Sequence, residues 1–519
     1  MYKYIIKFFQ FYPHILAILL LTSCNGSIDI TSPTGSNSIS SGASTAPGTP
    51  GLTADLSGVQ IGNAFLTGNG GPFADLSANE ELGLWVEDPK GGLFLVGATS
   101  SDMLETHAGR DIVVTHFNAD GTVDWYRHYG TTSLANNTGD ERPYYGTTDN
   151  DGNLIIFGDT SSSLVGTRDS TDVFSIEVSR TDGTVTWVKQ LEQTYSANAT
   201  ADNVIGGDRV GDRIFILGKV NGSYINAGGG LNDIFIHEFD LEGNRVSSTQ
   251  MNNNLIQAGA AGGAETPTAI VALSDGIVVT GISREDFASA TGAGTYNYFV
   301  IKTDFSYNWQ WSFTFGEDEP VAFGITDGNN FTLRALAKDS SDNIYLGGHA
   351  SGSGGLAFLE NAPSNASVIL SLTSAGAARW GRQFGAVTSG AAPFIANNAN
   401  DEIYELKVTD DGVFFAGHTQ GDLFDNDANT ANTNIITGLL NKDTGAVIWG
   451  DQLGTAKYAG AYFAPANQSN HERPTDIIVT NGKLLMLGYT QGTVADTNAG
   501  NKDFLYLSYD KLTGVLDAL

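Results

Sequence analysis

The chain has 519 residues, of which 41% are hydrophobic and 16% are charged, and 64 residues are glycine. Few charges, many glycines and no long helical pattern favour an all-β protein with a large core. Asp and Glu outnumber Lys and Arg by 57 to 26, which gives a net charge of −31. A field of that sign repels phosphate backbones, so the composition argues against nucleic acid as a partner.

The first 24 residues have the order of a bacterial export signal. Lys3 and Lys7 give a weakly positive start, residues 15–21 form an apolar run, and Leu-Thr-Ser-Cys follows at 21–24. The run is short for a membrane-spanning helix. The motif resembles the bacterial lipobox, in which the cysteine is acylated and becomes the mature N-terminus. The resemblance implies a lipoprotein signal peptide at 1–23 and lipidation of Cys24; an ordinary secretory signal with an incidental cysteine is the alternative.

The lipobox resemblance also implies a localisation. Several acyl chains are added in that family, which favours stable membrane anchoring over the weak hold of one chain. Asn25 follows the cysteine, where Asp is the usual inner-membrane retention signal of enteric bacteria. We therefore expect a lipid anchor in the outer membrane, with the protein facing the periplasm or the cell surface. Residues 24–52 are mostly Ser, Gly, Thr and Pro, which predicts a disordered tether.

One sequence unit recurs seven times from residue 80 onwards, so we expect a single folded domain at 53–519. In each unit a hydrophobic strand ends in a marker glycine, and the intervals between these glycines are 60 to 71 residues. The marker glycines are Gly97, Gly158, Gly218, Gly281, Gly348, Gly417 and Gly488.

Each unit continues in the same order after its marker glycine. A polar loop leads to a third strand, which begins at Asp111, Asp172, Asp233, Asn297, Ser367, Asn434 or Asp503. A tight turn and a fourth strand follow, and five fourth strands carry a tryptophan near their start: Trp125, Trp187, Trp311, Trp380 and Trp449. In unit three, Ser247 takes the place of the tryptophan.

Four short strands joined by tight turns make a β-meander, and seven such units predict a seven-bladed β-propeller of four-stranded blades. One such sheet cannot bury both of its faces alone, whereas sheets arranged around an axis cover one another. The tryptophans are therefore expected to pack between neighbouring blades.

The repeat resembles the bacterial beta-propeller repeat (SBBP) family over residues 80–519. The resemblance rests on Asp149-Asn150-Asp151-Gly152-Asn153 with Gly158-Asp159-Thr160-Ser161, and on Trp380 through Phe384-Gly385. Units three and four fit the pattern loosely, because Ser247 replaces the tryptophan and the first turn of unit four is shortened. The resemblance implies the propeller fold and little about chemistry.

The last unit ends without a complete fourth strand, and an open ring would expose an unpaired sheet edge. Residues 52–65 form a strand-like stretch upstream of unit one. We expect this N-terminal strand to complete the last blade, so that both ends of the chain close the ring together.

The long connections follow the second and fourth strands, which places them on one face of the propeller. Loops longer than a fold needs are commonly functional, so we place binding on this long-loop face. The candidate binding residues are the aromatics Phe394, Tyr458, Tyr462 and Phe463; the alternative is that they anchor the loops between blades. His349 and His418 follow marker glycines directly, and we expect them to lie on the surface or to line the channel.

Two groups of residues have the oxygen-ligand spacing of calcium loops. They are Asp149, Asp151 and Asn153, and Asp425, Asp427 and Asn429. Neither group continues to the distal acidic ligand of a helix-loop-helix site, and residues 149–153 also suit a hairpin turn. Calcium is thus the candidate metal, and no other cofactor is expected.

No Gly-x-Ser-x-Gly, His-Glu-x-x-His or phosphate-binding loop occurs in the sequence. We therefore expect a non-enzymatic, lipid-anchored protein of the cell envelope that binds a protein or a glycan through its long-loop face. Two alternatives stay open: an assembly scaffold at the outer membrane, and a propeller enzyme such as a quinoprotein or a sialidase-like glycosidase. The stretch 179–187 does not meet the sialidase box.

Overall fold

The computed structural model describes fourteen stretches of the chain. They belong to the second of the two units into which the chain divides, Met1–Ala46 and Pro47–Leu519. The stretches are residues 60–61, 80–100, 104–166, 171–191, 202–220, 233–251, 265–283, 297–315, 330–352, 362–385, 399–424, 433–453, 472–490 and 503–517. Every regular element in them is a β-strand. No helix in these stretches is long and apolar enough to cross a membrane.

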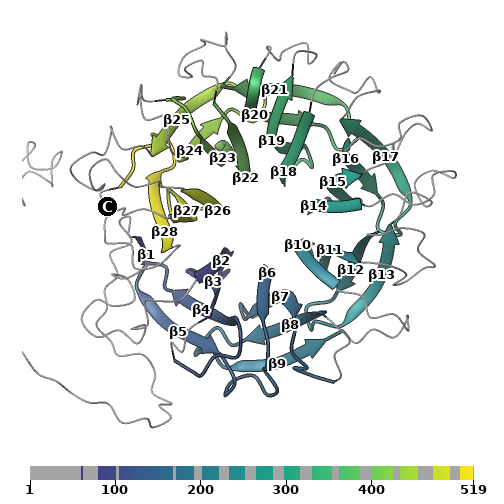
Figure 1. The fold of residues 1–519 in the computed structure, drawn as a ribbon, viewed down its shortest axis with the longest axis vertical. Helices are drawn as coiled ribbons and strands as arrows, with labels where there is room; N and C mark the ends of the chain where they lie inside the picture. Colours follow the sequence, from purple (N-terminus) through teal and green to yellow (C-terminus); the bar gives the residue numbers. More distant parts are fainter. Residues whose placement is uncertain are drawn as a thin grey trace, which may run out of the picture. The chain divides into compact units, whose positions relative to one another are not determined.

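Seven antiparallel sheets of four strands are arranged as blades around a central channel (Figure 1). The predicted all-β fold, a seven-bladed propeller, is confirmed. The first strands, nearest the centre, are β2 (Glu80–Glu87), β6 (Glu141–Thr148), β10 (Asp202–Val210), β14 (Glu265–Ala272), β18 (Asn330–Lys338), β22 (Asp401–Thr409) and β26 (Arg473–Thr480).

The remaining strands follow outward in chain order within each blade. The second strands are β3 (Leu93–Thr99), β7 (Leu154–Thr160), β11 (Arg213–Val220), β15 (Ile277–Ser283), β19 (Ile344–Gly352), β23 (Gly412–Thr419) and β27 (Lys483–Thr490). The third strands are β4 (Asp111–Phe117), β8 (Asp172–Val178), β12 (Asp233–Phe239), β16 (Asn297–Thr303), β20 (Ala362–Leu372), β24 (Asn434–Leu440) and β28 (Asp503–Asp510). The fourth strands are β5 (Val123–Tyr129), β9 (Val185–Gln190), β13 (Arg245–Met251), β17 (Trp309–Phe315), β21 (Ala378–Phe384) and β25 (Val447–Leu453), with β1 (Gln60–Ile61) on the edge of blade seven.

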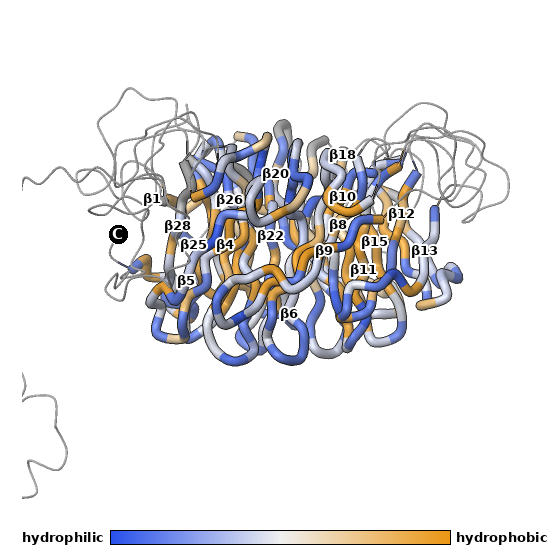
Figure 2. Tube along the Cα trace, turned by 90° about the horizontal axis from the view of Figure 1, so that it is seen from below, coloured by the Kyte–Doolittle hydropathy of each residue, from blue (hydrophilic) through white to orange (hydrophobic). Residues whose placement is uncertain are grey.

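The hydrophobic core is divided among the junctions between neighbouring blades. Each of seven clusters of buried apolar side chains draws its members from two adjacent blades. Between blades one and two, for example, Val96 and Ile112 pack with Ile156 and Phe174. Figure 2 shows the blades from the side, with hydrophobic residues along the strands and hydrophilic residues in the tight turns below. A blade therefore removes its apolar surface from water only when its neighbours are in place.

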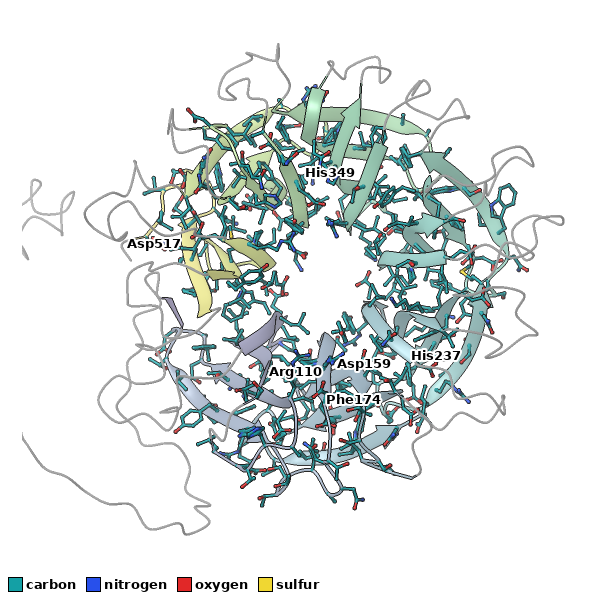
Figure 3. The ribbon with its side chains drawn as sticks, in the orientation of Figure 1. Arg110, Asp159, Phe174, His237, His349 and Asp517 are labelled. Atoms are coloured by element: carbon teal, nitrogen blue, oxygen red, sulfur yellow. The ribbon has the colours of Figure 1, made fainter. Side chains whose placement is uncertain are left out.

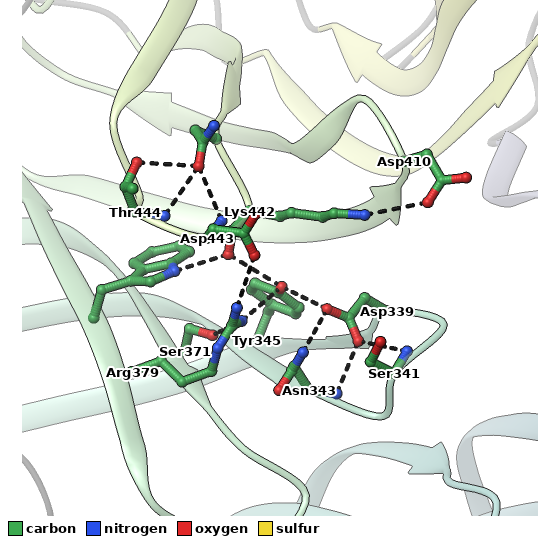
Figure 4. Close-up of polar contacts among 12 residues, drawn as sticks. Asp339, Ser341, Asn343, Tyr345, Ser371, Arg379, Asp410, Lys442, Asp443 and Thr444 are labelled. Atoms are coloured by element: carbon green, nitrogen blue, oxygen red, sulfur yellow. Dashed lines mark hydrogen bonds and ion pairs between the residues drawn. The ribbon is translucent and has the colours of Figure 1, made fainter.

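The tryptophan of a fourth strand contacts the tight turn between the third and fourth strands of the next blade. The indole N–H of Trp380 donates to the carbonyl of Lys442 at 2.9 Å (Figure 4). Its ring lies on Gly445, where a Cβ atom would come within 2.5 Å of the ring. The same hydrogen bond joins Trp125 to Arg180, Trp311 to Ser374 and Trp449 to Lys511. The predicted packing of these tryptophans between blades is confirmed.

The junction between blades three and four uses a different pair of side chains. Ser247 stands in the position of the tryptophan, and Tyr307 stands in the position of the turn glycine, with a φ of 62°. The two hydroxyl oxygens are 2.9 Å apart, and the ring of Tyr307 packs against the apolar cluster of this junction. The ring thus comes from the turn instead of the strand, so the departure of unit three from the pattern is compensated in unit four.

The first strands carry a β-bulge near their beginning, opposite the marker glycine. In β22 the register shifts between Ile403 and Glu405, and Ile403 pairs with Gly417. The first strands β6, β10, β14, β18 and β26 have the same shift. A Cβ atom at Gly417 would lie 2.2 Å from the carbonyl oxygen of Glu402. The marker glycine is required because the bulged strand approaches its backbone closely.

The outer edge of blade seven is paired with both ends of the propeller chain. Leu516 bridges to Tyr509, and the N–H of Asp517 donates to the carbonyl of Ser508 at 2.8 Å. Farther along β28 in the same direction, β1 pairs Gln60 with Leu505 and Ile61 with Phe504. The other residues of the stretch 52–65 lie outside the described part, so closure by a full N-terminal strand stays a prediction.

Deleting residues 52–66 should lower the Tm of the protein strongly, because the deletion removes β1 and exposes the edge of β28. Domains are stable by only about 5–15 kcal/mol, and the loss of one large buried side chain already costs about 3–5 kcal/mol. Thermal unfolding followed by circular dichroism measures the effect. A matched control, deletion of residues 30–44 in the Ser/Gly/Thr/Pro-rich stretch, should leave Tm unchanged. Equal Tm values for the two deletions would contradict closure by this segment.

Candidate functional site

The first strands enclose a channel of about 990 Å³, lined by residues from all seven blades. This volume lies at the upper end of the range of ligand pockets, about 300–1,000 Å³. The first strands begin where the long connections arrive from the preceding blades. One end of the channel therefore lies on the long-loop face, and the other end lies on the face of the tight turns.

The β-bulges determine which side chains reach the channel near the long-loop face. A bulge adds one residue to its strand and changes the direction of the side chains around it. The bulged residues are Tyr144, Ile205, Thr268, Arg334, Tyr404 and Thr475. All of these except Tyr404 line the channel.

Six polar residues of blades five, six and seven contact one another near the long-loop end of the first strands, and one of them, Arg334, lines the channel. We name them the mouth cluster: Arg334, His349, Glu402, Tyr404, His418 and Arg473. Figure 3 shows His349 toward the inner end of its blade, near the channel. The carboxylate of Glu402 lies at the centre of the cluster.

Glu402 accepts or contacts a polar group from three sides. The Nε of Arg334 donates to its Oε1, and the Nδ1 of His349 lies 3.0 Å from the same oxygen. The hydroxyl of Tyr404 donates to Oε2 at 2.7 Å. Burial alone would raise the pKa of Glu402, but the contacts with His349 and Arg334 outweigh burial and lower the pKa to about 2. The carboxylate is therefore charged over the whole physiological range.

The ring of Tyr404 is surrounded by planar nitrogen-containing groups. The imidazole of His418 stacks on it at a centroid distance of 5.2 Å. The guanidinium carbons of Arg473 and Arg334 lie 4.3 Å and 5.5 Å from the ring centroid, and Arg473 also donates to the Tyr404 hydroxyl. These contacts hold two guanidinium groups in place beside one aromatic ring.

The mouth cluster contains more cationic than anionic groups. Its described members include two guanidinium groups and one carboxylate. The side chain of Arg334 is 44% exposed, and in the described stretches its terminal nitrogens donate to no protein acceptor. Burial lowers the pKa of His418 to about 4, so its imidazole is neutral at pH 7. An external anion can therefore pair with Arg334 without displacing the contact to Glu402.

Deeper in the channel, two carboxylates occupy equivalent positions directly after the bulges of β22 and β26. They belong to Glu405 and Asp476, and the Oδ2 of Asp476 accepts the N–H of Trp85 at 2.6 Å. Enclosure by the blades raises the pKa of Glu405, and repulsion from Asp476 raises it further. Enclosure also raises the pKa of Asp476 to about 6. Both carboxyl groups thus hold their protons more tightly than exposed carboxyl groups do.

Buried carboxylates lie just beneath the long-loop face, at the start of the first and third strands. In blade two, Glu141 accepts the hydroxyl of Thr160 at 2.8 Å, and Asp172 accepts the amide of Gln190 at 2.7 Å. Gln190 also bonds to the backbone of the loop after the second strand, at Ser162 and Val165. In blade six, Asp401 accepts Thr419, and Gln452 bonds to Gly421 and Leu423. This layer ties the long loops to the sheets.

The first predicted calcium group forms the tight turn between β6 and β7. The Oδ1 of Asp149 accepts the N–H groups of Asp151 and Asn153 at 2.9 and 2.7 Å, and its Oδ2 accepts the Asn153 amide at 2.8 Å. The turns that begin at Asp240, Asp304 and Asp339 have the same Asp-to-Asn hydrogen bonds. Both carboxylate oxygens of Asp149 are therefore used within the turn.

The other predicted site residues lie outside the described stretches. They are Cys24, the aromatics Phe394, Tyr458, Tyr462 and Phe463, and the second calcium group of Asp425, Asp427 and Asn429. Within the described stretches, no group of three or more His, Cys, Asp or Glu residues is placed to hold a metal ion.

Some residues of the site were found from the sequence and others were not. His349 and His418 were expected on the surface or in the channel lining, but neither lines the channel; His418 is buried against the ring of Tyr404, and His349 contacts Glu402. Arg334, Glu402, Tyr404 and Arg473 were missed, because strand alternation does not show where a bulge redirects a side chain. The marker glycines were the available signal, since an isolated glycine in a strand indicates a bulge or a close backbone approach.

A histidine–serine pair lies away from the channel, between the third and fourth strands of blade three. The Nδ1 of His237 is 2.7 Å from the Oγ of Ser248, and burial lowers the pKa of His237 to about 3. Figure 3 shows His237 farther from the centre than Asp159. The imidazole packs against Phe235 and Phe239, so its contacts are those of a core residue.

Replacing Glu141 with Gln should change how stability depends on pH. Burial raises the pKa of Glu141 from its ordinary 4.5 to about 7, although the hydroxyls of Ser162 and Thr160 oppose the rise. The folded state holds this proton more tightly than the unfolded state. Its stabilising contribution is therefore complete below pH 4.5 and is lost as the pH rises to about 7.

The loss amounts to about 3 kcal/mol at most. Glu141→Gln should raise Tm relative to the natural chain at pH 8 and leave it unchanged at pH 4, as measured by calorimetry. The control Asp212→Asn changes a carboxylate that is 76% exposed and should not alter the pH profile. If Tm depends on pH in the Glu141→Gln protein as it does in the natural chain, the carboxyl group of Glu141 does not titrate as described.

Comparison with known proteins identifies no family for this chain. No family model matches the chain. No curated protein matches it.

Several solved structures resemble it at low identity. The β-propeller domain of the Trilobed protease from Pyrococcus furiosus is 10% identical with a TM-score of 0.40, over 85% of this chain and 98% of that chain. The polysaccharide lyase Uly1 is 10% identical with a TM-score of 0.44, over 84% and 90%. The GH93 α-L-arabinofuranosidase of Fusarium graminearum is 9% identical with a TM-score of 0.36, over 66% and 87%. The chain is a seven-bladed β-propeller protein, and these values transfer no activity to it.

Proposed function

We propose that this chain is a lipid-anchored, non-enzymatic protein of the bacterial cell envelope that binds an acidic glycan at the long-loop end of its channel. The observation that carries the proposal is the mouth cluster. It concentrates two guanidinium groups, from Arg334 and Arg473, around one tyrosine ring. The chain as a whole has a net charge of −31, so this cationic group is a local exception.

The chemistry of the cluster suits a carboxylated sugar. A guanidinium group binds a carboxylate through two parallel hydrogen bonds and is weakly hydrated, which makes it suited to partly buried sites. The ring of Tyr404 holds the guanidinium groups of Arg473 and Arg334 in place beside it, which fixes their positions before an acidic sugar binds. The raised pKa values of Glu405 and Asp476 reduce the repulsion that a second acidic sugar would meet deeper in the channel.

The envelope location rests on the sequence. The lipobox-like residues 21–24 and the Ser/Gly/Thr/Pro-rich stretch 24–52 suit an acylated Cys24 on a long tether. Asn25 after the cysteine favours the outer membrane. The turn Asp149–Asn153 and the marker glycines favour a repeat of the bacterial beta-propeller type.

Substituting both mouth arginines should abolish binding of an acidic glycan. Polygalacturonate, a polymer of uronic acids, is the probe, and dextran is the neutral comparison; isothermal calorimetry measures both. The double variant Arg334→Gln/Arg473→Gln should bind polygalacturonate at least about tenfold more weakly, because each charge-assisted pair contributes roughly 1.5–3 kcal/mol. The natural chain should not bind dextran.

The matched control is Arg127→Gln/Arg382→Gln. It removes the same charge from two fourth strands, where Arg382 donates to the carbonyl of Gly445, and it should keep full binding. If the control variant weakens polygalacturonate binding as much as the mouth variant does, binding results from general charge attraction and not from the proposed site. If polygalacturonate does not bind the natural chain, the acidic-glycan proposal fails.

The anchor has a separate test. Cells that express the chain should incorporate labelled palmitate into it, and Cys24→Ala should remove the label, because this is the only cysteine. The neighbouring substitution Ser23→Ala should retain the label. Labelling that persists in the Cys24→Ala protein would refute acylation at this residue.

A further inference from the structure

Two basic side chains line the channel among the residues that the structure describes, Arg334 of blade five and Lys407 of blade six. Arg334 belongs to the mouth cluster, whereas Lys407 does not. Arg334 is the bulge residue of β18, and Lys407 lies three residues beyond Tyr404, the equivalent bulge residue of β22. Three residues of strand correspond to about 10 Å. The two cations therefore lie at different depths below the long-loop face.

The side chain of Lys407 is exposed, and its charge acts across the channel. Burial raises the pKa of Asp208 in blade three and that of Asp476 in blade seven, and the ammonium group of Lys407 opposes both rises. Blade three is not a neighbour of blade six. The ammonium group therefore affects Asp208 through the interior of the channel.

Lys407 is not engaged by the fold. In the described stretches it forms no ion pair and donates no hydrogen bond. Other lysines of the propeller contact a carboxylate; they are Lys302, Lys442, Lys483 and Lys511. Arg334 likewise keeps its terminal nitrogens without a protein acceptor in the described stretches. Both channel cations thus have donors that a ligand can use.

Three of the carboxylates that line the channel already accept hydrogen bonds from the propeller. Asp208 accepts the N–H of Ala272 in the next blade at 2.7 Å, and Asp476 accepts an N–H of blade one in the same way. Asp88 accepts the Nε of Arg180 at 2.6 Å. These carboxylates therefore have roles in joining the blades, and they leave Lys407 to other partners.

Glu405 lies on β22 between the levels of Arg334 and Lys407. Enclosure raises the pKa of Glu405, and repulsion from Asp476 raises it further. In its protonated form this carboxyl group donates a hydrogen bond to an anionic or hydroxyl oxygen. The remaining carboxylate of the lining, Glu87, is the last residue of β2, on the tight-turn side.

The first strands surround the channel on all sides (Figure 1). A ligand that contacts both Arg334 and Lys407 must therefore lie along the channel axis. The end of a polymer can enter from the long-loop face and reach this position. A middle segment of the same polymer stays at the face, because it reaches Lys407 only if the whole chain is threaded through the propeller.

We propose that the propeller binds the end of an acidic glycan chain, which enters the channel so that one carboxylate pairs with Arg334 and a second pairs with Lys407. This inference rests on the proposed function and adds to it the part of the polymer that is recognised. Lys407 is the residue that distinguishes an inserted chain end from a chain that lies across the mouth cluster.

Substituting Lys407 tests the contact inside the channel. Lys407→Gln should bind trigalacturonate about three- to fivefold more weakly than the natural chain, because it loses one partly solvated ion pair. Its Tm should equal that of the natural chain. The control Lys442→Gln removes the same charge from a tight turn, where Lys442 pairs with Asp410 at 3.1 Å, and it should bind as the natural chain does. Isothermal calorimetry measures all three affinities.

Equal affinity of Lys407→Gln and the natural chain would overturn entry into the channel. The proposed function would survive that result if Arg334→Gln/Arg473→Gln still weakened binding, so the two failures are distinguishable. If trigalacturonate and polygalacturonate both fail to bind the natural chain, the proposed function and this inference fail together.

Polygalacturonates of two chain lengths separate end binding from binding along the chain. The number of protein molecules bound per glycan chain should be the same for the shorter and the longer polymer, because both have the same number of ends. Calorimetry at saturation gives this number. A number that rises in proportion to chain length would contradict recognition of the chain end.

Discussion

At five of the seven junctions, neighbouring blades are joined by an aromatic ring that lies on the tight turn of the next blade. At most junctions the ring is a tryptophan, whose N–H donates to a turn carbonyl and whose face lies on a glycine. Three requirements meet there: the indole must be buried, its N–H must find an acceptor, and the turn must leave space for the ring. At the junction of blades three and four, where Ser247 replaces the tryptophan, Tyr307 supplies the ring from the turn of the following blade.

The second recurring feature is the β-bulge in the first strand, which links the fold to the site. The marker glycine of the second strand allows the bulged backbone to come close, and the bulge redirects side chains at the long-loop end of the channel. The mouth cluster results from this geometry in three successive blades. Arg334 reaches Glu402 across 68 positions of sequence, and Arg473 reaches Tyr404 across 69. The mouth cluster therefore forms only when blades five, six and seven are docked.

Much of this fold could be predicted from the sequence, because the signals for strands and turns are local. The third strands β4, β8, β12, β16, β24 and β28 begin at the expected residues, and Trp125, Trp380 and Trp449 are buried between blades as predicted. The pairing of Gln60 and Ile61 with β28 lies in the stretch expected to close the ring.

The candidate site was less predictable, because it depends on contacts between units. Neither Glu402 nor Tyr404 stands in a motif, and their roles arise from arginines in the two flanking blades. Ser247 replaces the usual tryptophan and Tyr307 replaces the usual turn glycine, and the two residues are 60 positions apart. In the sequence, each of these two substitutions therefore looks like an unrelated irregularity of the repeat. By contrast, the spacing of Asp149, Asp151 and Asn153 suggested a set of calcium ligands. In the structure, both carboxylate oxygens of Asp149 accept hydrogen bonds within the hairpin turn.

Native-state hydrogen exchange, resolved to the second strand of each blade, tests mutual shielding of the blades most directly. No blade covers its own faces, so the central amides of β3, β7, β11, β15, β19, β23 and β27 should exchange only through one global opening. They should then share one free energy of opening and one dependence on denaturant concentration. The account would be contradicted by a blade that exchanges through a separate opening of lower free energy while the other six stay protected.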